Sequence, residues 1–100
     1  MSTDRTVVVT GAGQGLGAAI AAAAVRAGLT VGVLDRDEQA VFRCARELGS
    51  EAVALGADTS DDGQVEAALD RFAEVVGGPP AGVVCNAGIV RFGPLLDVSV

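Results

Sequence analysis

The stretch Val7-Val8-Val9-Thr10-Gly11-Ala12-Gly13-Gln14-Gly15-Leu16-Gly17 decides the fold of this chain. A β-branched apolar run leads into a loop with glycine at every second position, and an alanine-rich segment follows. Glycine has no Cβ, so the backbone can adopt positive φ and approach a ligand closely. The first turn of a helix also offers unpaired N–H groups to an anion. The stretch is therefore typical of a strand–turn–helix unit that holds a phosphate group.

Apolar strands and amphipathic helices alternate along the rest of the chain. We predict strands over Thr6–Thr10, Thr30–Leu34 with Asp35 at its end, Ala52–Leu55 and Gly82–Cys85. We predict helices over Leu16–Ala27, over Asp37–Leu48, and from Ser60 or Asp61 to the Gly77-Gly78-Pro79-Pro80 break. This alternation with short joints predicts an α/β fold of the doubly wound Rossmann type, with parallel strands in the order 3-2-1-4.

Each predicted helix has an apolar face that should pack on the sheet. In the first helix we expect this face to hold Leu16, Ile20, Ala23, Ala24 and Ala27. The corresponding positions of the other two helices recur at helical spacing; they are Ala40, Val41, Cys44, Ala45 and Leu48, and then Val65, Ala68, Leu69, Phe72, Ala73 and Val76.

Composition excludes several classes of function. One hundred residues allow one small domain, and half of them are hydrophobic. The net charge of −6, with no basic cluster, argues against a nucleic-acid partner. No apolar stretch reaches the roughly 18 residues of a membrane span, so we expect no membrane association and a cytoplasmic protein. Cys44 and Cys85 are expected to be buried free thiols, and no metal site is expected because histidine is absent.

The residues that most often carry acid–base chemistry are missing. The chain has no histidine and no tyrosine, and all seven basic residues are arginine. Neither an imidazole, a phenol nor an amine side chain is therefore present to move a proton near neutral pH. We assign no catalytic residue in this chain.

Four motifs in order carry a resemblance to a known family. They are the loop Thr10–Gly17, the acidic Asp35 at the end of the second predicted strand, Asp58 after the third, and Asn86-Ala87-Gly88 after the fourth. In this arrangement the chain resembles the non-extended branch of the short-chain dehydrogenase/reductase family, whose patterns are TGxxxGxG and NAG. The likeness covers nearly the whole chain.

The resemblance implies a dinucleotide cofactor and a set of residues that bind it. Gly11, Gly15 and Gly17 would shape the phosphate loop, and the acid matching Asp58 would bind the adenine amino group, with backbone contacts from Thr59. The full implied set is Gly11, Gln14, Gly15, Leu16, Gly17, Asp35, Asp58, Thr59, Asn86, Ala87 and Gly88. Alternatives remain open: Asp35 could be a helix N-cap, Asp58 a capping or turn carboxylate, and 86–88 an ordinary turn.

The choice between the two nicotinamide cofactors depends on Asp35. A carboxylate about 20 residues after the glycine loop suits a ribose 2′-OH and repels a 2′-phosphate. Asp35 therefore favours NAD over NADP, and the uncharged Gln14 agrees with this. Arg36 keeps NADP open, because a guanidinium just after the strand could pair with a phosphate.

The resemblance also implies what lies beyond this sequence. The catalytic Ser, Tyr and Lys of the family cannot be placed here. We therefore expect residues 1–100 to be the N-terminal part of one dinucleotide-binding domain, truncated before the catalytic half. The parent would be a homo-oligomeric NAD(P)-dependent oxidoreductase acting on an alcohol or carbonyl substrate, and the chain alone would be inactive.

Other functions are weighed against this one. The main alternative is a stand-alone dinucleotide-binding or sensor module without catalysis, which the missing tyrosine and lysine would suit. A methyltransferase or a sugar epimerase is a further alternative. The 86–88 turn argues against the former, and the spacing of Gly11, Gly15 and Gly17 argues against the latter.

Overall fold

The computed structural model describes residues 5–13 and 15–85. Strands and helices alternate in the order β1 (Thr6–Thr10), α1 (Gly15–Arg26), β2 (Thr30–Asp35), α2 (Glu38–Leu48), β3 (Ala52–Gly56), α3 (Asp62–Val76) and β4 (Gly82–Cys85). The predicted elements are all present, with bounds that shift by one or two residues. The small shifts occur at element ends: Asp37, for example, is the N-cap of α2 and not its first residue.

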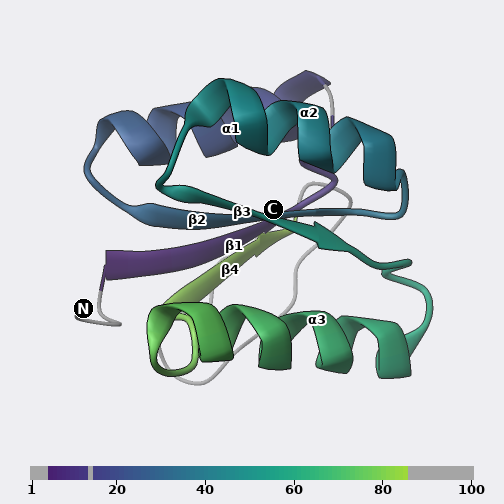
Figure 1. Cartoon of the computed structure of the whole chain (residues 1–100). Coiled ribbons are helices and arrows are strands. Elements are labelled where there is room, and N and C mark those ends of the chain that lie inside the picture. Colours follow the sequence, from purple (N-terminus) through teal and green to yellow (C-terminus); the bar gives the residue numbers. More distant parts are fainter. Residues whose placement is uncertain (1–4, 14, 86–100) are drawn as a thin grey trace.

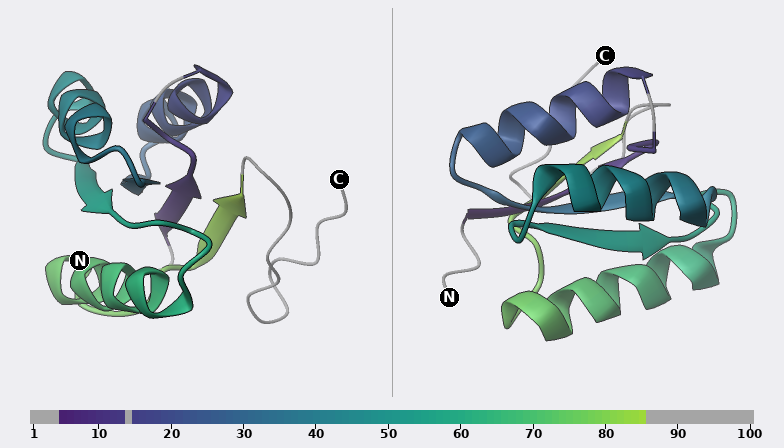
Figure 2. Two further views of the ribbon diagram at one scale, coloured as in Figure 1. Left: turned by 90° about the vertical axis from the view of Figure 1, so that its right-hand side faces the viewer. Right: turned by 45° about the horizontal axis from the view of Figure 1, so that its top comes forward.

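The four strands form one parallel sheet in the order β3-β2-β1-β4, as the sequence predicts. Helices α1 and α2 cover one face of this sheet and α3 covers the other (Figures 1 and 2). This is the doubly wound arrangement, with β1 in an interior position between β2 and β4. All strand carboxyl ends therefore lie at one edge, together with the amino ends of the helices.

The core has two layers, because alternate side chains of a strand point to opposite faces. Val8 belongs to the layer under α3, which surrounds the fully buried Phe72. The next residue, Val9, belongs to the layer under α1 and α2, together with Val41. The nearly continuous apolar strands are explained by this two-sided burial.

Asp37 and Asp61 cap the second and third helices. The Ala40 N–H donates to Asp37 Oδ1 at 3.1 Å, and the Gln64 N–H donates to Asp61 Oδ1 at 3.1 Å. The Gln64 side chain returns a second hydrogen bond, from Nε2 to Asp61 Oδ2 at 3.3 Å. These bonds satisfy N–H groups that the helices leave unpaired. The apolar faces predicted for α2 and α3 are confirmed by the buried residues of each helix.

The face predicted for α1 is wrong in part. Leu16 is 67% exposed, and Ala23 and Ala27 are also exposed. The buried residues of α1 are Gly17 and Ala21. The start of α1 makes its close contact, with the loop after β1, through a residue without a side chain, which a hydrophobicity pattern ranks low.

Gly17 brings the start of α1 against the loop after β1. A Cβ at this position would overlap the carbonyl oxygen of Gly11 and lie 2.7 Å from its carbonyl carbon and 3.1 Å from Ala12 Cα. These are backbone atoms, so no side-chain rotation could relieve the overlap. The absence of a side chain at Gly17 therefore allows the start of α1 to lie directly against the loop.

The two cysteines are both free thiols. Cys44 is buried on α2, and desolvation, with a smaller effect of nearby Glu47, raises the pKa of its thiol. Cys85 is only half-buried, because it ends β4 at the carboxyl edge of the sheet. The expectation of buried thiols is therefore right for Cys44 and too strong for Cys85.

Gly17→Ala is expected to lower the free energy of unfolding by about 1–3 kcal/mol, because the added methyl group forces α1 away from the loop. Alanine's better helix propensity offsets part of this cost. Chemical denaturation measures the change. Ala19→Ser, at an exposed position of the same helix, is the control and should change stability by less than about 0.5 kcal/mol. Equal stabilities of Gly17→Ala and the wild type would contradict the close contact.

Candidate functional site

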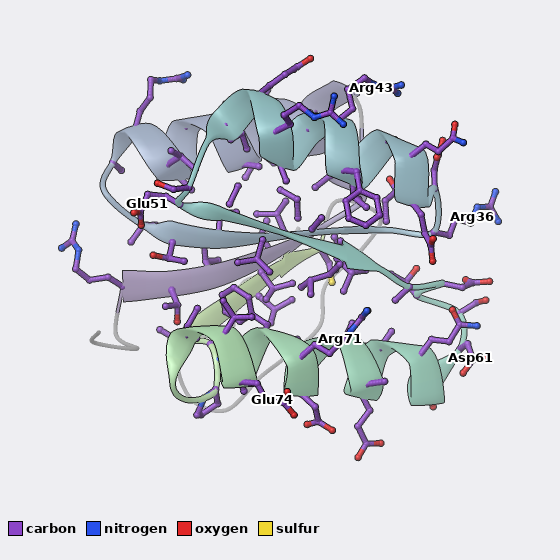
Figure 3. The ribbon with its side chains drawn as sticks, viewed as in Figure 1. Arg36, Arg43, Glu51, Asp61, Arg71 and Glu74 are labelled. Atoms are coloured by element: carbon purple, nitrogen blue, oxygen red, sulfur yellow. The ribbon has the colours of Figure 1, made fainter. Side chains whose placement is uncertain are left out.

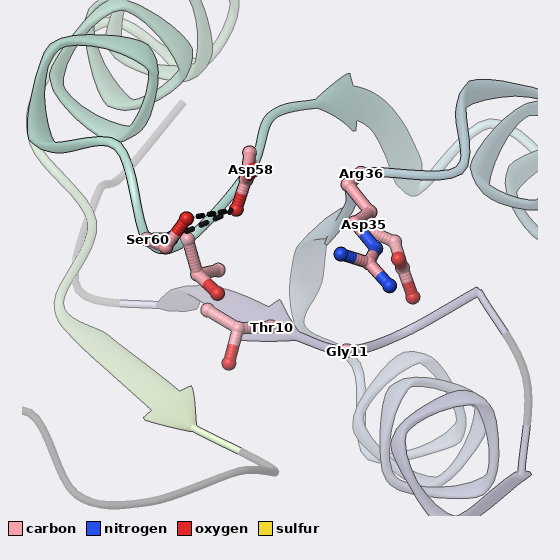
Figure 4. Close-up of a pocket in the computed structure, with 7 residues that line it drawn as sticks. Thr10, Gly11, Asp35, Arg36, Asp58 and Ser60 are labelled. Carbon is pink, nitrogen blue, oxygen red and sulfur yellow. Dashed lines mark hydrogen bonds between the residues drawn. The ribbon is translucent and has the colours of Figure 1, made fainter.

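A cleft of about 280 Å³ opens at the carboxyl edge of the sheet. The ends of β1 and β2 and the segment after β3 line it, as Figure 4 shows. Polar and charged groups gather here, and Arg36 and Asp61 lie at this edge while Glu51 lies at the opposite one (Figure 3). The lining residues are Thr10, Gly11, Asp35, Arg36, Asp58, Thr59 and Ser60.

Asp35 ends β2 and contributes a half-buried carboxylate to the cleft. Its Oδ2 accepts a hydrogen bond from the Gly13 N–H at 3.1 Å, and its Oδ1 accepts one from the Asp37 N–H at 3.3 Å. Asp37, and not Asp35, caps α2. The alternative of a simple N-cap is therefore wrong for Asp35, whose carboxylate is held between the glycine loop and the start of α2.

Asp58 contributes the second carboxylate. Its Oδ1 accepts two hydrogen bonds from Ser60, one from the hydroxyl at 2.7 Å and one from the N–H at 2.9 Å. These bonds favour the charged form and hold the pKa of the Asp58 carboxyl below its ordinary value of 3.8, with a smaller effect from the positive charge of Arg36. The Asp58 backbone N–H donates to Gln64 Oε1 at 2.9 Å.

From the sequence, Asp58 could either hold a turn or bind a ligand. Asp58 does hold that turn, through one carboxylate oxygen. Within residues 5–13 and 15–85, Oδ2 of Asp58 accepts no hydrogen bond. The carboxylate can thus support the turn and still offer an acceptor to a ligand.

Arg36 is exposed and lines the cleft between the two acids. Its side chain lies beside that of Asp35 in Figure 4. One arginine thus lines the cleft together with two carboxylates, so the cleft is not a strongly positive environment. Such an environment suits hydroxyl and amino groups better than a phosphate dianion.

The glycine loop adjoins this cleft and leads into α1. Gly11 and Gly15 both have a φ of 64°, a conformation that a residue with a side chain rarely adopts. Apart from its chain neighbours, no atom of the described residues lies within 4 Å of a Cβ built at Gly15, so among these residues the surface there is open. The N–H groups of the first turn of α1 are unpaired within the helix and favour an anion.

The structure brings together four of the residues predicted to bind a cofactor: Gly11, Asp35, Asp58 and Thr59 line the cleft. Gly15, Leu16 and Gly17 form the first turn of α1. Gln14 and the segment 86–88 lie outside the described residues. Among the described residues of the predicted cofactor set, Leu16 differs from expectation: it is predicted to lie on a buried helix face, but its side chain is exposed.

Sequence reasoning missed the roles of Gly13 and Ser60. In the sequence Ser60 appears only as a possible start of the third helix, although an acid followed two residues later by serine is a turn signal. From the sequence, Gly13 is one of four glycines in the loop and has no individual role. Gly13 and Asp35 are 22 positions apart. A short sequence motif therefore cannot reveal the contact between them.

A second hollow, of about 210 Å³, lies between the sheet and α3 and is lined mainly by apolar side chains: Val8, Leu34, Val65, Leu69, Val83 and Cys85. Among residues 5–13 and 15–85, no group of three or more acidic, histidine or cysteine side chains could hold a metal ion. No helix in this part of the chain is long and apolar enough to span a membrane.

Comparison with known proteins identifies the family. The model of the family described as short chain dehydrogenase matches residues 5–100. The chain belongs to the short-chain dehydrogenase family. The resemblance drawn from the four sequence motifs is confirmed at this level.

Curated relatives of the short-chain dehydrogenase family match most of the chain. An inactive 2-(S)-hydroxypropyl-CoM dehydrogenase 2 of Xanthobacter autotrophicus is 45% identical over 81 residues, which are 81% of this chain and 35% of that protein. 2-(S)-hydroxypropyl-CoM dehydrogenase 3 of the same organism is 36% identical, over 96% of this chain and 38% of its own length. Oxidoreductase UcpA of Salmonella typhimurium is 37% identical, over 97% of this chain and 37% of its own length. The chain thus spans little more than a third of these relatives.

Solved short-chain dehydrogenase structures have the same fold. A short-chain type dehydrogenase/reductase from Mycobacterium marinum gives a TM-score of 0.76 at 33% identity, covering 94% of this chain and 39% of that one. A 3-ketoacyl-(acyl-carrier-protein) reductase from Brucella melitensis, complexed with NADH, gives a TM-score of 0.71 at 34% identity, covering 73% of this chain and 30% of that one.

Ser60→Ala should raise the pKa of the Asp58 carboxyl toward its ordinary value, because it removes the shorter of the two hydrogen bonds. NMR titration of the aspartate carboxyl carbons measures this. Since the folded-state pKa is lowered, the stabilisation is present above the ordinary pKa and lost as pH falls through the folded one. Ser60→Ala should therefore lose less stability on acidification than the wild type.

Ser50→Ala, at an exposed turn between α2 and β3, is the matched control and should leave the Asp58 titration unchanged. An Asp58 pKa that is the same in Ser60→Ala and the wild type would show that the Ser60 hydroxyl does not bind the carboxylate in solution.

Proposed function

We propose that this chain is the dinucleotide-binding part of an NAD-dependent oxidoreductase that acts on an alcohol or carbonyl substrate. The observation that carries the proposal is the position of Asp35 and Asp58 in one cleft beside the glycine loop. Family membership and a structural neighbour complexed with NADH support it. The residues of this chain would bind and orient the cofactor, which supplies the hydride chemistry when bound.

The cleft and loop fit the parts of a dinucleotide. The diphosphate would rest on the first turn of α1, where Gly15 leaves open space and the N–H groups face an anion. The adenosine ribose would lie against Asp35, and the adenine amino group would donate to Asp58. Thr59 would add backbone contacts, and we assign Gln14, Leu16 and the segment 86–88 to the same site as further proposals.

NAD is the proposed cofactor because of the charge of the cleft. Asp35 can accept hydrogen bonds from both ribose hydroxyl groups, since each of its oxygens accepts only one bond from the described residues. A 2′-phosphate at the same place would meet the Asp35 carboxylate, in a cleft that also holds the carboxylate of Asp58. Arg36 would offset part of this repulsion, so NADP is expected to bind more weakly and not to be wholly excluded.

The assignment extends to the protein that carries this chain. We propose that residues 1–100 are the N-terminal part of one Rossmann domain and that catalytic residues lie outside them. A cytoplasmic homo-oligomer is the proposed state. No nucleic-acid or membrane partner is part of the proposal, and the chain alone is expected not to turn over substrate.

Titration calorimetry on the protein at its natural length tests the cofactor assignment. The wild type should bind NAD more tightly than NADP. Asp35→Ala should weaken NAD binding by about 10- to 100-fold, because it removes charged hydrogen bonds to the ribose, and should leave NADP binding unchanged or improve it. Failure of the wild type to bind either dinucleotide would overturn the proposed function.

The adenine contact is tested with a modified cofactor. Nicotinamide hypoxanthine dinucleotide carries a carbonyl oxygen in place of the adenine amino group, so it would meet the Asp58 carboxylate acceptor to acceptor. The wild type should prefer NAD over this analogue by about tenfold or more, and Asp58→Ala should lose that preference. Glu66→Ala, at an exposed position of α3, is the control and should keep it. A preference that survives Asp58→Ala would contradict the assignment.

A further inference from the structure

We infer that Gly13 is a specificity-determining residue: its N–H and its missing side chain hold the Asp35 carboxylate where it distinguishes a ribose diol from a 2′-phosphate. The inference rests on the proposed function and adds to it a residue outside the predicted cofactor set. Its basis is the contact between the glycine loop and the end of β2, which are 22 residues apart in the chain.

The first observation is the hydrogen bonding of the carboxylate. The Gly13 N–H donates to Oδ2 at 3.1 Å, and the Asp37 N–H donates to Oδ1 at 3.3 Å. Within the part of the chain that the structure describes, each oxygen of Asp35 is thus held by one backbone donor. A carboxylate oxygen accepts up to two hydrogen bonds, so each retains one acceptor position. The carboxylate is fixed in orientation and can still accept two ribose hydroxyl groups.

The second observation is the space at Gly13. A Cβ built there would lie 2.9 Å from Asp35 Oδ2, 3.3 Å from Asp35 Cγ and 2.9 Å from Ala40 Cβ. Ala40 is 3% exposed, and its N–H donates to the capping residue Asp37. Ala40 therefore belongs to the packed start of α2 and cannot move easily. The Asp35 side chain is the neighbour that can move.

Any side chain at residue 13 should therefore displace the carboxylate or lift the loop. Either movement breaks the bond from the Gly13 N–H and frees Asp35 to rotate. A freely rotating carboxylate binds the diol less well, because ordering it costs conformational entropy. Its repulsion of a 2′-phosphate also falls when it can turn away. The ratio of NAD to NADP affinity should drop.

The effect would act through Asp35 and not through the phosphate loop in general. A mere distortion of the loop would weaken both dinucleotides equally, since both carry the same diphosphate. Loss of the hydrogen bond from Gly13 to Asp35 instead changes the ratio of the NAD and NADP affinities, and this change disappears once the carboxylate is removed. A double-mutant cycle separates these two outcomes.

The experiment measures NAD and NADP affinities by calorimetry for the wild type, Gly13→Ala, Asp35→Ala and the double variant, at the protein's natural length. Gly13→Ala should lower the NAD/NADP affinity ratio by about fivefold or more, mainly by weakening NAD. In the Asp35→Ala background the same change should alter the ratio by less than about twofold. Gln39→Ala, at an exposed position beside Ala40, is the control and should keep the wild-type ratio.

A second measurement does not require Gly13→Ala to fold. Hydrogen exchange of the Gly13 amide in the wild type should be slowed relative to that in Asp35→Ala, where its acceptor is missing. Equal exchange in the two proteins, an unchanged affinity ratio in Gly13→Ala, or full additivity in the cycle would each overturn the inference while leaving the proposed function intact. A wild type that binds neither dinucleotide would overturn both.

Discussion

Parallel pairing of the strands in a fixed register is the constraint on which the rest of this structure depends. Thr10 is paired with Leu34 across β1 and β2, and Asp35 with Gly56 across β2 and β3. The last residues of three strands therefore reach the same edge together. Each following loop begins there, so Gly11, Asp35 and Asp58 meet in one cleft although up to 47 positions separate them (58 − 11).

Two kinds of backbone contact then turn this edge into a site. At Gly17 the missing side chain lets the start of α1 rest on the Gly11 carbonyl group. At Gly13 and Ser60, backbone N–H groups hold the carboxylates of Asp35 and Asp58. The first turn of α1 thus presents N–H donors to an anion, while the cleft beside it presents carboxylate acceptors. This division underlies our proposal that the site binds a dinucleotide, which carries both phosphates and sugar hydroxyl groups.

The sequence was sufficient for the fold and for most of the candidate site. Strand order, the faces of α2 and α3, and the acids at the ends of β2 and β3 follow from periodicity and from the ordered motifs. The buried face of α1 follows only in part. Ile20 and Ala24 pack against the core as predicted, whereas Leu16 is exposed and the buried residues are Gly17 and Ala21, which hydrophobicity ranks low. The contacts of Gly13 with Asp35 and of Ser60 with Asp58 depend on side-chain placement, which spacing alone does not determine. The predicted residues Gln14, Asn86, Ala87 and Gly88 lie outside the described part of the chain.

The central claim is that a nicotinamide dinucleotide lies along the carboxyl edge of this sheet. A crystal structure of the protein grown with NAD tests it most directly. The account predicts adenosine between Asp35 and Asp58, with a ribose hydroxyl group on the Asp35 carboxylate and the diphosphate against the first turn of α1. Adenosine bound elsewhere, for example in the apolar hollow between the sheet and α3, or a diphosphate away from Gly15, would contradict it.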